Sequence, residues 1–162
     1  MSFLLWLEST RLGTFVGQSE SIWGYPIFTT VHTIGLSIIV GISTVVAIRL
    51  MGFAPTIPLA PLNKLFPIMW FGFAINLFSG SGLMAAAAST TVPNPLFIAK
   101  IIFVLSAVAV MAVLQVKVFR DPEIDNKPLD TMSKALAGLL LGLWLLAMIA
   151  GRLIAYTDKI FT

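Results

Sequence analysis

The chain has 162 residues, of which 58% are hydrophobic and 10% are charged, and its formal net charge is +3. An average soluble domain carries about 25% charged residues, so this composition excludes an ordinary soluble protein and indicates an integral membrane protein. The basic residues lie mainly at the ends of apolar segments, which indicates membrane topology and argues against a nucleic-acid partner. The sequence has no cysteine, which excludes disulfides, thiolate metal sites and cysteine nucleophiles.

The N-terminal segment is too short and too charged to span a bilayer. Residues 3–16 are largely apolar, but Glu8 and Arg11 interrupt them. This pattern predicts an amphipathic helix that lies in the membrane interface. A polar turn follows, in which Ser19 or Ser21 is the predicted N-cap of the next helix.

Long apolar runs occupy most of the remaining chain. At about 20 residues per crossing, they predict four transmembrane helices over residues 22–51, 62–88, 95–119 and 129–156. Asn94 followed by Pro95 is typical of a helix start, with an N-cap and then a proline in the first turn. The sequence therefore predicts one domain, residues 1–162, with an all-α fold: an integral membrane four-helix bundle with an N-terminal amphipathic interfacial helix.

The basic residues near the helix ends favour one orientation. On one side of the membrane the flanking basic residues are Arg49, Lys64, Lys117, Arg120, Lys127 and Lys134. On the other side they are Arg11 and Lys159, because Lys100 and Arg152 lie within helices. Since cytoplasmic loops carry the excess of Lys and Arg, both termini are predicted to face the periplasm or exterior of a bacterial inner membrane.

Several polar residues are predicted to reach one depth in the membrane. The only histidine, His32, lies seven residues after Tyr25, Lys100 lies six residues after the N-cap of its helix, and Arg152 lies four residues before Tyr156. At 1.5 Å per residue, His32, Lys100 and Arg152 lie about 6 to 10 Å below the exterior surface. The second predicted helix adds three polar side chains near this layer, which are Asn76, Ser79 and Ser81.

The fourth predicted helix is expected to turn its polar residues toward the interior of the bundle. Gly138 and Gly142 begin a stripe at helical spacing that ends at Arg152 and Tyr156. Such a glycine step predicts that another backbone approaches closely. An arginine on this buried face, with no acidic residue at the same depth, favours an anionic ligand.

Two interpretations of this layer remain open. In the structural one, His32 and the serines only hydrogen-bond neighbouring helices, and Lys100 and Arg152 extend to the lipid headgroups. In the functional one, His32 ligates a haem iron or binds a quinone or relays a proton. A haem b would pair its propionates with Lys100 and Arg152, and Met84 or a partner subunit would have to supply a second iron ligand. The candidate cofactor-binding residues are His32, Asn76, Ser79, Lys100, Arg152 and Tyr156, with His32 also the candidate metal ligand.

Motifs of common enzyme classes do not occur in the sequence. It has no H-E-x-x-H, P-loop or G-x-S-x-G pattern, so the chain is not expected to be an enzyme by itself. We expect a membrane subunit that binds a haem or quinone-type cofactor near the periplasmic face for electron transfer with a partner protein. The alternatives are a structural, assembly or anchor subunit and, less favoured, a small-solute or ion conduit. The expected partners are the lipid bilayer and either further copies of this chain or other membrane or periplasmic subunits.

The motifs S-I-W-G-Y-P-I-x-x-x-x-H-x-x-G-L-S, W-x-G-F-x-x-x-L-x-S-G, N-P-x-F-x-x-K and G-R-x-I-A-Y are spread over nearly the whole chain. In these motifs the chain resembles a family of small bacterial inner-membrane proteins of unknown function, which implies the four-helix topology and the importance of the polar layer. The family's recurring positions fall on Trp23, Gly24, His32, Gly35, Gly80, Lys100, Gly151, Arg152 and Tyr156. A looser similarity to four-helix b-type cytochromes and copper-resistance membrane proteins, where H-x-x-G near a helix start is common, implies a haem site, although those proteins normally carry several histidines.

Overall fold

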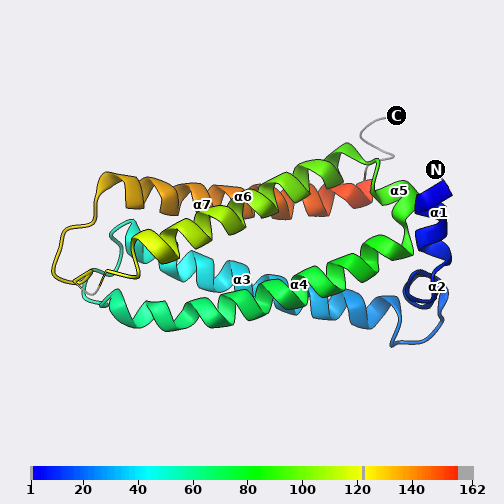
Figure 1. Ribbon diagram of the computed structural model, residues 1–162, viewed down its shortest axis with the longest axis horizontal. Helices are drawn as coiled ribbons and strands as arrows, with labels where there is room; N and C mark the ends of the chain where they lie inside the picture. The colour runs from blue at the N-terminus through cyan, green and yellow to red at the C-terminus, as the bar shows by residue number, and fades with distance from the viewer. Residues whose placement is uncertain (1, 122, 157–162) are drawn as a thin grey trace.

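The computed structural model describes residues 2–121 and 123–156, and every regular element in these ranges is a helix (Figure 1). The elements are α1 (Ser2–Ser9), α2 (Arg11–Gln18), α3 (Tyr25–Leu50), the 3₁₀ helix η1 (Ala60–Leu65), α4 (Phe66–Ala86), α5 (Ala88–Thr91), α6 (Pro95–Lys117), α7 (Thr131–Leu153) and the 3₁₀ turn η2 (Ile154–Tyr156). The predicted all-α fold is confirmed.

Four of these segments are long and apolar enough to cross a membrane, and they cover residues 25–50, 60–86, 95–117 and 131–156. They agree with the predicted spans to within a few residues. Large apolar side chains also cover their outer surface, including Phe71, Phe78 and Leu105, each of which is about 60% exposed or more. Such a continuous apolar exterior requires lipid around it, so the chain is a multi-pass membrane protein.

The four long helices form two hairpins that pack side by side. Helix α3 packs against α4 and also against α7, and α7 packs against α6. Figure 1 shows the α3–α4 pair below the α6–α7 pair. The core between them includes the fully buried side chains of Ile39, Leu50, Met69, Met111 and Leu140.

Helices α3 and α4 approach most closely where two glycines face each other. A Cβ atom added to Gly35 would lie 3.0 Å from the Gly72 carbonyl oxygen and 3.0 Å from the Asn76 nitrogen. A Cβ atom added to Gly72 would lie 2.8 Å from Cγ2 of Ile38. The two backbones are therefore close together, and a larger residue at either position would force its neighbours to shift.

The close approach predicted at Gly138 and Gly142 is not formed within the described chain. A Cβ atom at Gly142 would meet nothing within 4 Å, and one at Gly138 would meet only the Met51 sulfur, at 3.9 Å. Within the described chain, no other backbone therefore approaches these two glycines, because the small-residue step alone does not say which neighbour a glycine faces.

The orientation predicted for the fourth span is wrong. Its buried residues are Ser133, Ala137, Leu140, Trp144, Ala147 and Ala150. The stripe through Leu145, Ile149, Arg152 and Tyr156 is exposed. The physical reason is that lipid is as apolar as the protein core, so the hydrophobicity of a membrane helix does not distinguish its inner face from its outer face.

The N-terminal segment forms two helices in place of the single one predicted over residues 3–16. The break lies at Thr10, whose backbone is extended and whose hydroxyl accepts a hydrogen bond from the Gly13 nitrogen, so α2 begins with its own N-cap. In Figure 1, α1 and α2 lie across the end of the bundle at which α3 begins. The Glu8 carboxylate fixes α1 there, because it accepts hydrogen bonds from the nitrogen and the hydroxyl of Ser89, both at 2.7 Å.

Helix α3 begins at Tyr25, three residues later than predicted, so neither Ser19 nor Ser21 caps it. The residue that precedes it is Gly24, which has no side chain to cap the helix. Ser19 and Ser21 instead accept hydrogen bonds from the backbone nitrogens of Ser21 and Trp23 within the preceding turn. By contrast, the predicted start of α6 is confirmed, since the Asn94 side chain accepts a hydrogen bond from the Leu96 nitrogen at 2.9 Å.

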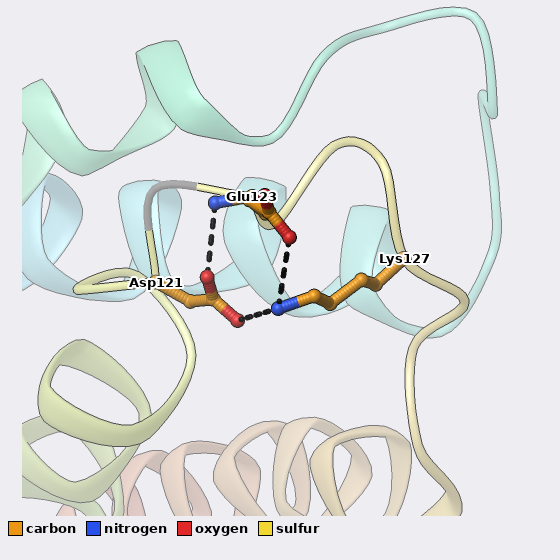
Figure 2. A network of polar contacts seen from close by, with 3 residues as sticks. All are labelled: Asp121, Glu123 and Lys127. Atoms are coloured by element: carbon orange, nitrogen blue, oxygen red, sulfur yellow. Dashed lines mark hydrogen bonds and ion pairs between the residues drawn. The ribbon is translucent and has the colours of Figure 1, made fainter.

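The polar loop between α6 and α7 joins the two hairpins at the opposite end of the bundle. The Asp125 carboxylate accepts hydrogen bonds from the nitrogens of Leu59 and Ala60, at the start of η1. Within the loop, the Lys127 ammonium lies 3.3 Å from both Asp121 and Glu123 (Figure 2).

These loop charges shift one another's protonation. A hydrogen bond from the Glu123 nitrogen, followed by one from Lys127, lowers the pKa of Asp121 below its usual range. The hydrogen bonds that Lys127 donates to the Asp121 and Glu123 carboxylates raise the pKa of Lys127. The groups are exposed, so they organise the loop and add little to its stability.

The described ends of the chain lie together. Helix α1 and the end of α7 occur at the same end of the bundle in Figure 1, away from the polar loop. This arrangement agrees with the prediction that both termini lie on one side of the membrane. Lys159, which entered the charge count, lies outside the described residues.

Candidate functional site

Side chains of α4 and of α6 with the residues that follow it meet near the polar loop, whereas a pocket lies between the two helices farther along. Near the loop, the rings of Phe66 and Phe119 meet edge to face with centroids 5.0 Å apart, and Trp70 Nε1 donates a hydrogen bond to Gln115 Oε1 at 2.9 Å. The first half of α6, residues 95–106, has no fully buried residue. Because neither helix fills the gap between them there, a pocket remains.

This pocket has a volume of about 200 Å³ and lies between α4 and α6, with α3 behind it. Its lining residues are His32 from α3, Phe73, Asn76, Leu77, Gly80, Ser81 and Met84 from α4, and Phe97, Lys100, Ile101 and Val104 from α6. Leu77, Ser81 and Ile101 are exposed, which places its mouth on the lipid-facing side of the bundle. His32 and Lys100 lie about 8 to 10 Å along their helices from the end that carries α1 and α2.

The hydrogen bonds around His32 favour one tautomer of its ring. His32 Nδ1 lies 3.1 Å from the Ser79 hydroxyl, and that hydroxyl donates to the Ile75 carbonyl at 2.7 Å. A serine hydroxyl has one proton, so a hydroxyl that donates to the Ile75 carbonyl can only accept from His32, which assigns the ring proton to Nδ1. The neutral imidazole then presents Nε2 as a hydrogen-bond acceptor.

The position of the imidazole depends on two neighbours from α4. Asn76 Nδ2 donates to the His32 carbonyl at 3.0 Å and so fixes the local backbone of α3 against α4. A Cβ atom on Gly80 would lie 3.1 Å from His32 Cε1 and 3.4 Å from Nδ1. The Nδ1–Cε1 edge of the ring therefore lies over Gly80, and His32 lines the pocket.

Lys100 brings a positive charge to the same pocket. Its side chain passes along Gly151 of α7, since a Cβ atom there would lie 3.4 Å from Lys100 Cδ and Cε and 3.6 Å from Nζ. Within residues 2–121 and 123–156, no hydrogen bond or salt bridge holds the ammonium. A partly buried cation is costly without a partner, so this pocket favours a ligand that brings oxygen acceptors or negative charge.

The structure brings some of the predicted residues together and separates others. His32, Asn76 and Lys100 line one pocket, and Ser79 supports the imidazole from behind. Arg152 and Tyr156 are exposed and are not among the residues that line it. Of the two cations predicted to lie near His32, only Lys100 lines its pocket in the described chain.

Sequence reasoning missed the apolar walls of the pocket. On α6, Phe97, Ile101 and Val104 share a face with Lys100 at helical spacing, and this pattern was available in the sequence. The wall from α4 includes Met84, which the sequence offered only as a possible iron ligand. The sequence did not show that a pocket would remain between these faces of α4 and α6.

The volume of the pocket constrains what it can hold. Sites for drug-sized ligands are roughly 300–1,000 Å³, and a haem requires a site of that class. A pocket of about 200 Å³ with a largely apolar lining fits a single ring with oxygen substituents better than a macrocycle. Comparison with protein-family models, curated proteins and solved structures gives no match to this chain, so the pocket is interpreted from its own geometry.

Proposed function

We propose that this chain is a membrane subunit that binds the ring of a quinone-type cofactor in the pocket between α4 and α6, for electron transfer with a partner protein. The observation that carries the proposal is the Lys100 ammonium, which has no hydrogen-bond or ion-pair partner in the described ranges and lines a lipid-facing pocket together with His32.

The chemistry of the pocket matches such a ring. Phe73, Phe97 and Val104 offer apolar walls for its faces, and Lys100 is the donor for one of its oxygens. The lateral mouth lets a long apolar substituent remain in the lipid. When bound, the cofactor supplies a carrier of two electrons and two protons, and the chain supplies orientation and hydrogen bonds.

We place the protein in a bacterial inner membrane with the pocket near the periplasmic face. The support is the distribution of basic residues: Arg49, Lys64 and Lys117 lie near the loop end of the bundle, whereas Arg11 lies at the end that carries α1 and α2. Basic residues concentrate on the cytoplasmic side. The resemblance to small bacterial inner-membrane proteins agrees with this placement.

A structural or anchor subunit is the second candidate, and one observation favours it. The hydrogen bonds of His32 to Ser79 and Asn76 all join α3 to α4, so these side chains also stabilise helix packing. In this alternative, Lys100 extends toward the lipid headgroups and no cofactor binds.

Cofactor binding by the purified full-length chain distinguishes the two candidates. The visible spectrum with and without dithionite reports a haem, and solvent extraction reports co-purified quinone. Added decyl-benzoquinone is then titrated against the chain in lipid nanodiscs. Absence of a haem spectrum, of extracted quinone and of titratable binding would refute a cofactor subunit and leave the structural one.

The Lys100→Met variant tests the residue that carries the proposal. A hydrogen bond to a charged group contributes about 1.5–3 kcal/mol, so the dissociation constant for decyl-benzoquinone is expected to rise about 10- to 150-fold. Lys64→Met is the matched control, because Lys64 is exposed and lies at the opposite end of the bundle. Equal binding by the wild type and Lys100→Met would contradict the role of Lys100.

A further inference from the structure

We infer that the pocket binds the reduced ring, a hydroquinone, more tightly than the oxidised quinone, with His32 Nε2 as the acceptor of a hydrogen bond from one ring hydroxyl. This inference rests on the proposed quinone-type site and assigns the redox form that the site prefers. It follows from which polar atoms of the pocket donate and which accept.

The single hydroxyl proton of Ser79 determines whether His32 Nε2 can accept a hydrogen bond. Two backbone carbonyls lie within reach of the Ser79 hydroxyl, those of Ile75 at 2.7 Å and Asn76 at 3.3 Å, and both can only accept. The hydroxyl proton therefore goes to the backbone of α4, and the bond between His32 and Ser79 must use the proton on Nδ1. Nε2 is left with a lone pair and no proton.

The other polar side chains of the pocket lining, apart from Lys100, also offer acceptor atoms. The Ser81 hydroxyl already donates to the Leu77 carbonyl at 2.8 Å, so only its lone pairs are available. Asn76 uses its amide nitrogen on the His32 carbonyl, and its side-chain oxygen has no hydrogen-bond partner within the described ranges. Asn76 keeps a second amide hydrogen, so the pocket offers two donors, the Lys100 ammonium and the Asn76 amide, together with several acceptors.

The two redox forms match this inventory differently. A quinone has two carbonyl oxygens that only accept, so it satisfies Lys100 and leaves His32 Nε2 facing a second acceptor. A hydroquinone has two hydroxyl groups: one donates to Nε2, and the oxygen of the other accepts from Lys100. An acceptor left unpaired in an apolar site weakens binding, so the reduced ring is favoured.

The test compares decyl-benzoquinone with its hydroquinone, titrated anaerobically against the wild-type chain in lipid nanodiscs. We expect the hydroquinone to bind at least about tenfold more tightly, which for a two-electron couple raises the midpoint potential of the bound pair by about 30 mV. If neither form binds, both the proposed function and this inference are overturned. If both forms bind but the quinone binds equally well or better, only this inference is overturned.

Ser79→Ala tests the origin of the preference. Without the serine, His32 can carry its proton on Nε2 and donate to a quinone, so the tenfold preference should fall to about equal affinities while binding persists. Ser37→Ala is the matched control, since that hydroxyl donates to the Thr33 carbonyl at 2.9 Å on the exposed face of α3. A preference retained in Ser79→Ala would overturn the assignment.

If the Ser79→Ala variant fails to fold, the protonation of His32 can be measured directly in the wild type. The chain has one histidine, so ¹⁵N-labelled histidine gives a single imidazole in the NMR spectrum of the wild type. The inference requires a protonated Nδ1 and an unprotonated Nε2. A protonated Nε2 would overturn it.

Discussion

Replacing Gly35 by alanine should destabilise the bundle, whereas the same change at Gly41 should not. The two residues lie on α3, six positions apart, and Gly35 faces α4 while Gly41 is exposed. A Cβ atom on Gly35 would lie 3.0 Å from two backbone atoms, the Gly72 oxygen and the Asn76 nitrogen. A Cβ atom on Gly41 would meet nothing within 4 Å.

The magnitude follows from two opposing effects. Alanine has a higher helix propensity than glycine by about 1 kcal/mol, and this gain is common to both variants because both sites are inside α3. Overpacking at Gly35 costs about 1–3 kcal/mol, since backbone atoms of α4 cannot rotate away as a side chain can. The difference between the two variants is therefore about 1–3 kcal/mol in favour of Gly41→Ala.

The assay is thermal unfolding of both variants and the wild type in the same detergent. Gly41→Ala is expected to unfold at the wild-type temperature or above, and Gly35→Ala several degrees below Gly41→Ala. The added methyl group of Gly35→Ala should push α3 away from α4 and lengthen the contact between His32 and Ser79. The affinity for decyl-benzoquinone should therefore fall in Gly35→Ala and not in Gly41→Ala. Equal stability of the two alanine variants would refute the close approach of the helices.

Three further predictions concern single contacts. Hydrogen bonds from the nitrogen and then the hydroxyl of Ser89 lower the pKa of Glu8, so the contact stabilises the folded chain above the ordinary glutamate pKa of about 4.3 and is lost as the pH falls further. The protection of the α1 amides, measured as exchange relative to the intrinsic rate at each pH, should fall below about pH 4 in the wild type, and the same fall in Glu8→Gln would contradict the assignment. Asp125→Ala removes the acceptor at the start of η1 and should speed amide exchange there about fivefold, as expected for the loss of about 1 kcal/mol; unchanged exchange would show that the cap is not needed. Gly80→Val would place its side chain against His32 Cε1, 3.1 Å from the position of Cβ, and should abolish decyl-benzoquinone binding while the helix content measured by circular dichroism is retained; full binding would contradict the position of the ring.

The sequence by itself determined the class of the protein and the approximate limits of its helices. Long apolar runs require helices in a bilayer, because lipid offers no hydrogen bonds to an open backbone. Caps and prolines act within a few residues, so the start of α6 at Asn94 and Pro95 could be predicted from local chemistry. Depth along a helix is also a matter of counting, which is why His32 and Lys100 were placed correctly at one level.

Only the tertiary structure decided the rotation of each helix and the spacing between helices. The pairs that fix the ends of the bundle, Glu8 with Ser89 and Asp125 with Leu59, are separated by 81 and 66 residues, and no local pattern marks them. The outward position of Arg152 could not be predicted, because both faces of α7 are apolar and lipid competes equally with protein for either face. The pocket lies between α4 and α6, with His32 of α3 in its lining. Its existence depends on how the helices pack together, and the sequence of each helix alone does not specify that packing.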